Sequence, residues 1–343
     1  MILYIGTRIS LSHVKEINII KQQRDDITKI VLMNEQEHNY MNFGDENTFN
    51  FRKLINWANE KNIEVIVVNG WRSGTPPMHD TSNPKYNCIK EVRTWDTAFF
   101  TIAFNSFRGS EREQKSFHLD SSDDIKYTLV SLNNKPHYHR CFMMDLLQKY
   151  GLIENQAISW ITPSKTSEFA QDREFKYNYW DEKKLVLTDT YQETLNSYAM
   201  MPTEYYSSFI QIVNESTMSC DFITEKTTIP LFLKKPFVVF NTRNYNLWLK
   251  ELGFQLYDEI FDYSFDSIEN FEDRFESGVK EISRINSMTR QQQFALYQQV
   301  IPKLEYNRQL AIEYVTKFPD IVKPIAIDTH ADYSVRLFDK LNF

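Results

Sequence analysis

The sequence has few cysteines and glycines and no long apolar run. Its three cysteines are widely spaced and form no Cys-x-x-Cys pair, which argues against a disulfide scaffold and a cysteine zinc site. Eight glycines beside 15% aromatic residues exclude a disordered, low-complexity chain. No segment approaches the roughly 20 apolar residues of a membrane-spanning helix. Met1–Gly6 is too short for a signal peptide, so we expect a cytoplasmic protein, in a cell or in an infected host.

The chain has 343 residues and an apolar content of 42%, enough for two globular domains with their own cores. Its 46 acidic residues outnumber its 39 basic ones and give a formal charge of -7. This balance argues against a protein that coats DNA non-specifically, which needs an electropositive surface. It leaves a nucleic-acid substrate open, because a basic patch can coexist with net acidity.

The first third of the chain alternates short apolar runs with amphipathic stretches. Apolar residues recur at helical spacing in 49–61, at Phe51, Leu54, Ile55 and Ala58. We expect further helix over 11–21 and strands over 2–5, 29–33, 64–68 and 98–104. This β-α-β alternation predicts a parallel sheet covered on both faces.

The pattern restarts after the polar stretch 109–124, which we take as a linker or surface loop. We expect strands over 126–132, 157–161, 209–214 and 236–240. We expect helices over 140–150 (with Gly151 as C-cap), 246–252, 267–284, 289–318 and 332–341. The sequence therefore predicts two α/β domains, residues 1–122 and 123–322. A last segment, 323–343, would pack back on the first domain.

Ligands of open α/β sheets bind beyond the carboxyl ends of the strands, which directs attention to loops. Four loops qualify, at Gly6–Arg8, Asn69–Asp80, Asn133–Arg140 and Glu215–Lys226. Arg140 follows a strand and a polar turn and opens a helix. A helix start and a guanidinium together suit a diphosphate, although a surface arginine paired with a nearby acid is the simpler interpretation.

The segment Glu215–Lys226 places two glutamates and a lysine between two predicted strands. An ammonium can bind a phosphate, and a carboxylate can accept both hydroxyl protons of a ribose. The alternative is an ordinary helix start with Thr224 as its cap and solvated charges behind it.

Metal ligands are sparse in the sequence. His137 and His139 have no further ligand at typical spacing. The acidic box Asp262–Asp266 has three residues between its aspartates, and we expect a turn with a helix cap at Asp266 or Ser267. We therefore predict no metal site.

The pattern Glu215-x5-Asp221-Phe222-x-Thr224-Glu225-Lys226 resembles the donor-binding signature of the α1,3-fucosyltransferase family. Phe222 stands where that family has tyrosine, and Ser216 where it has asparagine. The stretch from about 126 to 290 also resembles glycosyltransferase-like proteins of bacteriophages and large viruses. The shared segments are Thr224–Pro230, Lys235–Phe237, Leu252–Phe254 and Asp262–Asp266.

The resemblance implies a glycosyltransferase of the GT-B type, with two Rossmann-type domains, a cleft between them and a helical C-terminal region. It implies that Lys226 and Arg140 contact the diphosphate of a nucleotide sugar and that Glu225 binds its ribose. Glu215, Phe222, Thr224 and Arg8 complete the expected donor site. The expected mechanism is metal-independent and needs no further cofactor, because cations and helix starts neutralise the departing diphosphate.

An inverting transferase also needs a general base for the acceptor hydroxyl. We expect it in the first domain and favour Asp80 and His79, which end a long loop after a strand. The acceptor would be a saccharide or a hydroxymethylated base of phage DNA. The alternative function is a non-catalytic protein that binds a nucleotide sugar or a saccharide with a degenerate transferase fold.

Overall fold

The structure is a computed structural model that describes residues 2–6, 26–34, 44–45, 49–69, 80–93, 116–161, 185, 187, 201–216, 218 and 221–316. The chain divides into two compact units, residues 1–102 with 315–343 and residues 103–314. Each unit contains a four-stranded parallel sheet with helices, so the predicted α/β class is confirmed. The predicted elements 11–21, 98–104 and 332–341 lie outside the described residues.

The sheet of the first unit has the strand order β1-β2-β5-β6, with every neighbouring pair parallel. A two-stranded antiparallel ribbon, β3 with β4, precedes its helix α2. The elements are β1 (Ile2–Gly6), β2 (Lys29–Asn34), β3 (Gly44–Asp45), β4 (Phe49–Asn50), α2 (Phe51–Glu60), β5 (Glu64–Asn69), the 3₁₀ turn η3 (Pro84–Tyr86) and β6 (Ile89–Arg93).

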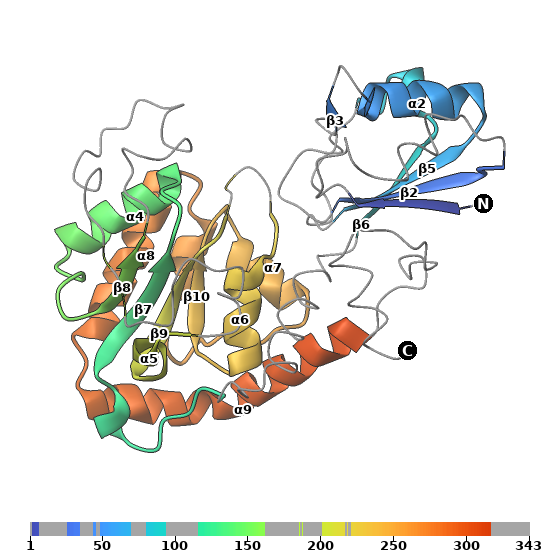
Figure 1. The fold of residues 1–343 in the computed structure, drawn as a ribbon. Helices are drawn as coiled ribbons and strands as arrows, with labels where there is room; N and C mark the ends of the chain where they lie inside the picture. Colours follow the sequence, from blue (N-terminus) through green and yellow to red (C-terminus); the bar gives the residue numbers. More distant parts are fainter. Residues whose placement is uncertain are drawn as a thin grey trace. The chain divides into compact units, whose positions relative to one another are not determined.

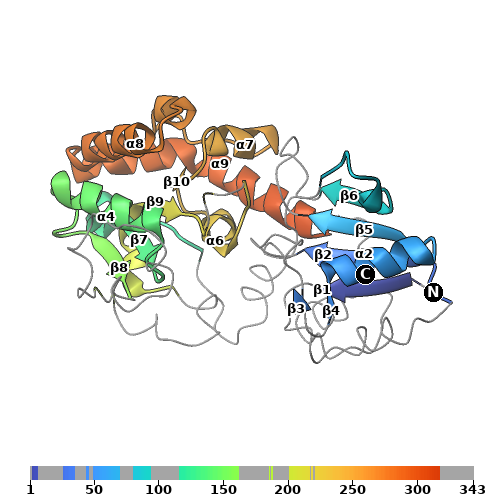
Figure 2. The same ribbon diagram turned by 90° about the horizontal axis from the view of Figure 1, so that it is seen from above.

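Helix α2 lies across one face of this sheet (Figures 1 and 2). Leu54 and Ala58 are among its fully buried side chains, at the helical spacing seen in the sequence. They share one apolar cluster with Ile30, Leu32 and Val65 of the strands. Because every second side chain of a strand points to the same face, Ile30 and Leu32 both meet the helix.

The sheet of the second unit is also entirely parallel, with the strand order β10-β9-β7-β8. All residues of β8, β9 and β10 are buried, as expected for strands of a parallel sheet covered on both faces. The strands are β7 (Tyr127–Asn133), β8 (Ala157–Trp160), β9 (Ser208–Asn214) and β10 (Phe237–Phe240).

The helices of the second unit cover both faces of this sheet (Figure 1). On one face, Phe240 of β10 packs against Phe275 of α8 with ring centroids 5.4 Å apart. On the other face, Val130 of β7 shares a core with Tyr205 of α5 and Ile229 of α6. The elements are η4 (Ser122–Asp124), α4 (Tyr138–Lys149), α5 (Thr203–Tyr206), α6 (Glu225–Leu233), α7 (Tyr245–Glu251), η8 (Tyr263–Ser267), α8 (Phe271–Asn286) and α9 (Arg290–Thr316).

Helix α9 starts beside the amino end of β7. There Arg290 donates to the Thr128 hydroxyl (2.8 Å) and to the Lys126 carbonyl (3.1 Å). In Figure 1 this helix runs along the edge of the sheet at which the strands begin. The carboxyl ends of the strands, where α/β proteins bind ligands, are at the opposite edge.

The chain changes direction between β7 and β9. From β7 it continues through α4 to β8 on one side, and from β9 through α6 to β10 on the other side. Since α4 and α6 leave neighbouring strands toward opposite faces, their beginnings diverge at the carboxyl ends of β7 and β9. This arrangement is the topological switch point at which doubly wound sheets bind their ligands.

The predicted helices and strands that lie within the described residues are present, with ends shifted by a few residues. Gly151 has φ +65 just after α4, which confirms it at the helix end. The predicted cap of α8 was wrong: Asn270 caps this helix and accepts from the Asp273 amide. Asp266 instead accepts from Asn246 (3.0 Å) and from the Leu247 amide. None of the helices described has both the length and the apolar character needed to cross a membrane.

Candidate functional site

Two helices begin at the switch point of the second unit. Helix α4 starts after His137, four residues beyond the end of β7. Helix α6 starts after Thr224, whose hydroxyl accepts from the Lys226 amide at 3.3 Å. The first amides of each helix leave positive partial charge at its start, and this charge favours an anion.

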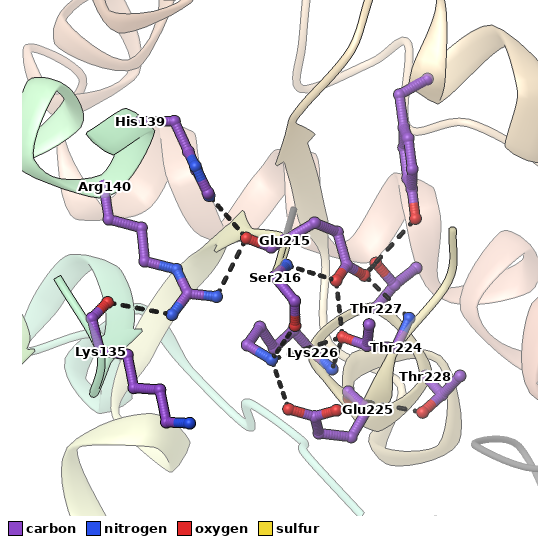
Figure 3. A network of polar contacts seen from close by, with 11 residues as sticks. Lys135, His139, Arg140, Glu215, Ser216, Thr224, Glu225, Lys226, Thr227 and Thr228 are labelled. Carbon is purple, nitrogen blue, oxygen red and sulfur yellow. Dashed lines mark hydrogen bonds and ion pairs between the residues drawn. The ribbon is translucent and has the colours of Figure 1, made fainter. Parts of the chain in front are cut away.

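The start of α4 is bonded to the segment that follows β9. His139 Nε2 donates to the Glu215 carbonyl (2.7 Å), and the Arg140 guanidinium donates to the same oxygen (3.0 Å). Arg140 also donates to the Lys135 carbonyl at 3.1 Å. Both side chains are buried. Arg140 thus joins the loops after β7 and β9, as Figure 3 shows.

The Glu215 carboxylate points the other way, toward α6 (Figure 3). Its Oε1 accepts from the Thr224 amide (3.1 Å) and the Thr227 hydroxyl (2.5 Å). Its Oε2 accepts from the Ser216 amide (3.1 Å) and the Thr224 hydroxyl (2.6 Å). Glu215 is only 1% exposed. A buried carboxylate of this kind is stable only with such a complete set of donors.

Glu225 and Lys226 open α6 as an ion pair. Their side chains retain 16% and 23% exposure, more than the other motif residues of this cluster. The Lys226 ammonium also donates to the Ser216 hydroxyl at 2.8 Å and to the Thr224 hydroxyl at 3.5 Å. Among the motif side chains that this cluster brings together, solvent or a ligand can therefore reach those of Glu225 and Lys226.

The potential at the start of α4 is positive. Burial, together with the charges of Arg140, Lys226 and Lys135, lowers the pKa of His137 to about 3. Burial and Arg140 also hold the pKa of His139 well below its ordinary value. Both imidazoles are therefore neutral at pH 7. The three cations near His137 contribute positive potential here, and this potential favours an anion.

The two glutamates respond differently to this environment. Burial raises the pKa of Glu215, because removing a carboxylate from water disfavours its charged form. Burial acts on Glu225 in the same sense, but the adjacent Lys226 ammonium outweighs it and lowers the pKa of Glu225. Glu225 is accordingly the anionic partner of Lys226 at neutral pH.

The structure brings together five of the predicted site residues, Arg140, Glu215, Thr224, Glu225 and Lys226. Phe222 is only 1% exposed, so its ring belongs to the core, and its carbonyl accepts from the Tyr245 hydroxyl at 2.8 Å.

Of the three candidate residues in the first unit, the structure describes one, Asp80. Arg8 and His79 lie outside the described residues. Asp80 is exposed and forms a local turn, in which it accepts from the Ser82 amide (3.0 Å) and the Ser82 hydroxyl (2.6 Å).

Sequence reasoning missed three side chains of this cluster. Ser216 lies within the motif, at the position where the fucosyltransferases have asparagine, but was given no role. Thr227 directly follows the motif, and its three-residue spacing from Thr224 could have indicated it. Tyr245 comes from α7 and approaches Glu215 at 3.4 Å. No local pattern indicates Tyr245, because its contact is made through the tertiary fold.

Within the described part of the chain, no group of three or more histidine, cysteine or acidic side chains is suited to a metal ion. Asp262 caps η8 by accepting from the Ser264 amide at 2.9 Å. His137 and His139 stack with ring centroids 5.9 Å apart.

No family model matches this chain, and no curated protein or solved structure is significantly similar to it. The functional conclusion therefore depends on the site itself.

Proposed function

We propose that the protein is a glycosyltransferase whose second unit binds the diphosphate of a nucleotide sugar at the switch point between β7 and β9. The observation that carries this proposal is the pair of diverging helix starts, each with its own cation: Arg140 on α4 and Lys226 on α6. A diphosphate carries several negative oxygens and suits two cations beside two helix starts.

Each motif residue has a role in this proposal. Lys226 contacts the diphosphate as a point charge, and Arg140 supports the positive potential from the α4 side. A phosphate oxygen competes with Glu225 for the Lys226 ammonium, and the released carboxylate then accepts the hydroxyl protons of the ribose. Binding thus exchanges one ion pair for another.

The chemical step breaks the bond between the anomeric carbon and the diphosphate oxygen and forms a bond to the acceptor oxygen. The departing oxygen gains negative charge, which Lys226, Arg140 and the helix starts stabilise. The proton of the acceptor hydroxyl passes to a general base. Asp80 and His79 remain the residues that we predict from the sequence for this role, in a GT-B arrangement with the first unit on the acceptor side.

The first experiment is a thermal-shift screen of the full chain against GDP-, UDP-, CMP- and dTDP-sugars, because a ligand that binds the folded state stabilises it by mass action. The stabilising donor is then incubated with the protein, and release of free sugar is measured. Binding with slow sugar release supports the transferase. Binding without any turnover would favour the non-catalytic alternative, and no shift with any donor would contradict the proposal.

The acceptor is tested with the donor identified in that screen. We expect transfer to a saccharide or to DNA that contains hydroxymethylated bases. The net charge of -7 favours a saccharide, whereas the resemblance to bacteriophage proteins favours modified DNA. Mass spectrometry of both acceptors after incubation distinguishes these substrates.

A further inference from the structure

Glu215 is bonded to both helix starts of the site. Its backbone carbonyl accepts from His139 and Arg140 of α4, whereas its carboxylate accepts from Thr224 and Thr227 of α6. Figure 3 shows this residue between the two groups. The main chain and the side chain of one residue thus connect the two halves of the cluster.

The groups around the Glu215 carboxylate are hydrogen-bond donors, which do not suit the NH₂ group of a glutamine. Each oxygen faces one backbone N–H and at least one hydroxyl. Oε1 accepts from Thr224 N, Thr227 Oγ1 and the Tyr245 hydroxyl, and Oε2 accepts from Ser216 N and Thr224 Oγ1. A carboxylate is an acceptor at both oxygens, whereas a glutamine amide carries an NH₂ group on one side. In either orientation, a glutamine at 215 would turn that NH₂ toward a backbone N–H.

Ser216 and Thr224, which donate to the Glu215 carboxylate, also contact the Lys226 ammonium. Lys226 Nζ donates to the hydroxyls of Ser216 (2.8 Å) and Thr224 (3.5 Å). The backbone amides of both residues donate to Glu215. Glu215 therefore fixes the two oxygen acceptors that orient the cation, although no contact joins its carboxylate to that cation directly.

We propose that Glu215 is a positioning residue, which sets the place of the Lys226 ammonium for an anionic ligand and does not itself contact the donor. This inference rests on the proposed function and corrects the expectation that Glu215 binds the donor. Its carboxylate accepts from five donors of the protein, the four above and the Tyr245 hydroxyl, and Glu215 is only 1% exposed, so a ribose hydroxyl has no access to it.

A double-mutant cycle tests this role with inorganic pyrophosphate as the probe and calorimetry as the measurement. We expect Glu215→Gln to weaken pyrophosphate binding about tenfold in the otherwise unchanged chain, and less than about twofold when Lys226 is already alanine. An equal loss in both backgrounds would mean that Glu215 acts independently of Lys226 and would overturn the inference.

Thr227→Val provides a milder variant if Glu215→Gln does not fold. It removes one hydroxyl from Oε1 with little change of shape, and we expect pyrophosphate binding to weaken about threefold. Thr228→Val is the matched control. Thr228 is equally buried on the same helix, but its hydroxyl donates to the Glu225 carbonyl (3.4 Å). An equal effect of both variants would overturn the inference.

A ligand-free measurement separates this inference from the proposed function. In protein labelled with ¹³C-lysine, the Lys226 side-chain signal is assigned by its loss in Lys226→Arg. We expect Glu215→Gln to shift this signal and to leave that of Lys250, an exposed lysine of α7, unchanged. If pyrophosphate does not bind but the signal moves, only the proposed function fails. An unmoved Lys226 signal would overturn the positioning role.

Discussion

The ammonium of Lys235 lies 3.6 Å from the centroid of the Phe117 ring. The Lys235 side chain is fully buried between α6 and β10, and it also donates to the carbonyls of Tyr205 (2.7 Å) and Ser208 and to the Ser208 hydroxyl (2.9 Å). One side chain thus joins the segment before β7, the end of α5 and the start of β9. Burial lowers the pKa of this lysine well below its ordinary value.

We expect Lys235→Ala to lower the free energy of unfolding by about 3 kcal/mol, because it removes the ammonium donor from two buried carbonyls and removes buried methylene groups. Urea denaturation measures this loss. Lys234→Ala is the control: Lys234 pairs with Glu305 at 2.6 Å near the surface, and a surface pair contributes about 1 kcal/mol at most. Equal losses would contradict the structural role of Lys235.

Gly278 allows α8 to approach β10 closely. A Cβ atom at this position would lie 2.4 Å from Phe240 Cε1 and 3.1 Å from Phe265 Cδ2. Phe240 and Phe265 are both buried, so neither ring can easily move away. We expect Gly278→Ala to destabilise the protein by about 1–3 kcal/mol, although alanine normally stabilises a helix relative to glycine.

Thermal unfolding measures the effect of Gly278→Ala. Ser277→Ala, at the preceding and partly exposed position of α8, is the control and should change stability by less than about 0.5 kcal/mol. A stabilising effect of Gly278→Ala would show that α8 and β10 are farther apart than described.

Lys226→Ala should weaken nucleoside diphosphate binding at least about tenfold, since a hydrogen bond to a charged group contributes about 1.5–3 kcal/mol. Lys250→Ala, which removes an exposed lysine of α7, is the matched control and should leave the affinity unchanged. Calorimetry with the nucleoside diphosphate of the best donor measures both. Unchanged affinity of Lys226→Ala would remove this residue from the proposed site.

His137 should make the folded state sensitive to acid. In the unfolded chain its pKa returns to 6.5, whereas in the folded protein it is about 3. Between these values the unfolded state binds the extra proton, so stability is fully present above pH 6.5 and falls as the pH decreases toward 3. His137→Gln should remove this part of the pH dependence. Urea denaturation from pH 7 to pH 4 measures both proteins, and parallel curves would contradict the prediction.

The regular elements were predictable because their patterns are local. The spacing of Leu54 and Ala58 indicated α2, and the mostly apolar run in 209–214 indicated a buried strand. The strand β6 was missed, because its sequence Ile-Lys-Glu-Val-Arg is mostly polar. It pairs with β5 on the edge of the sheet, where polar side chains are tolerated.

The sequence predicted which residues form the site, but it did not predict the role of each. Residue types and spacing selected Arg140, Glu215 and Lys226. Which of these side chains face solvent depends on how β7 and β9 lie beside each other in the sheet. A pattern in the linear sequence does not show this arrangement. Burial accordingly separates Glu225 and Lys226, which remain accessible, from Glu215, whose carboxylate accepts from amides and hydroxyls of the protein itself.

The buried Glu215 carboxylate also affects the exchange of amide protons with solvent. The amides of Ser216 and Thr224 lie outside every strand and helix, where exchange is usually fast. Both donate to an acceptor that is shielded from water, so each opens only when the Glu215 network opens. In a hydrogen-exchange experiment these two loop amides would therefore behave like amides of the sheet, and their protection would report directly on the integrity of the cluster.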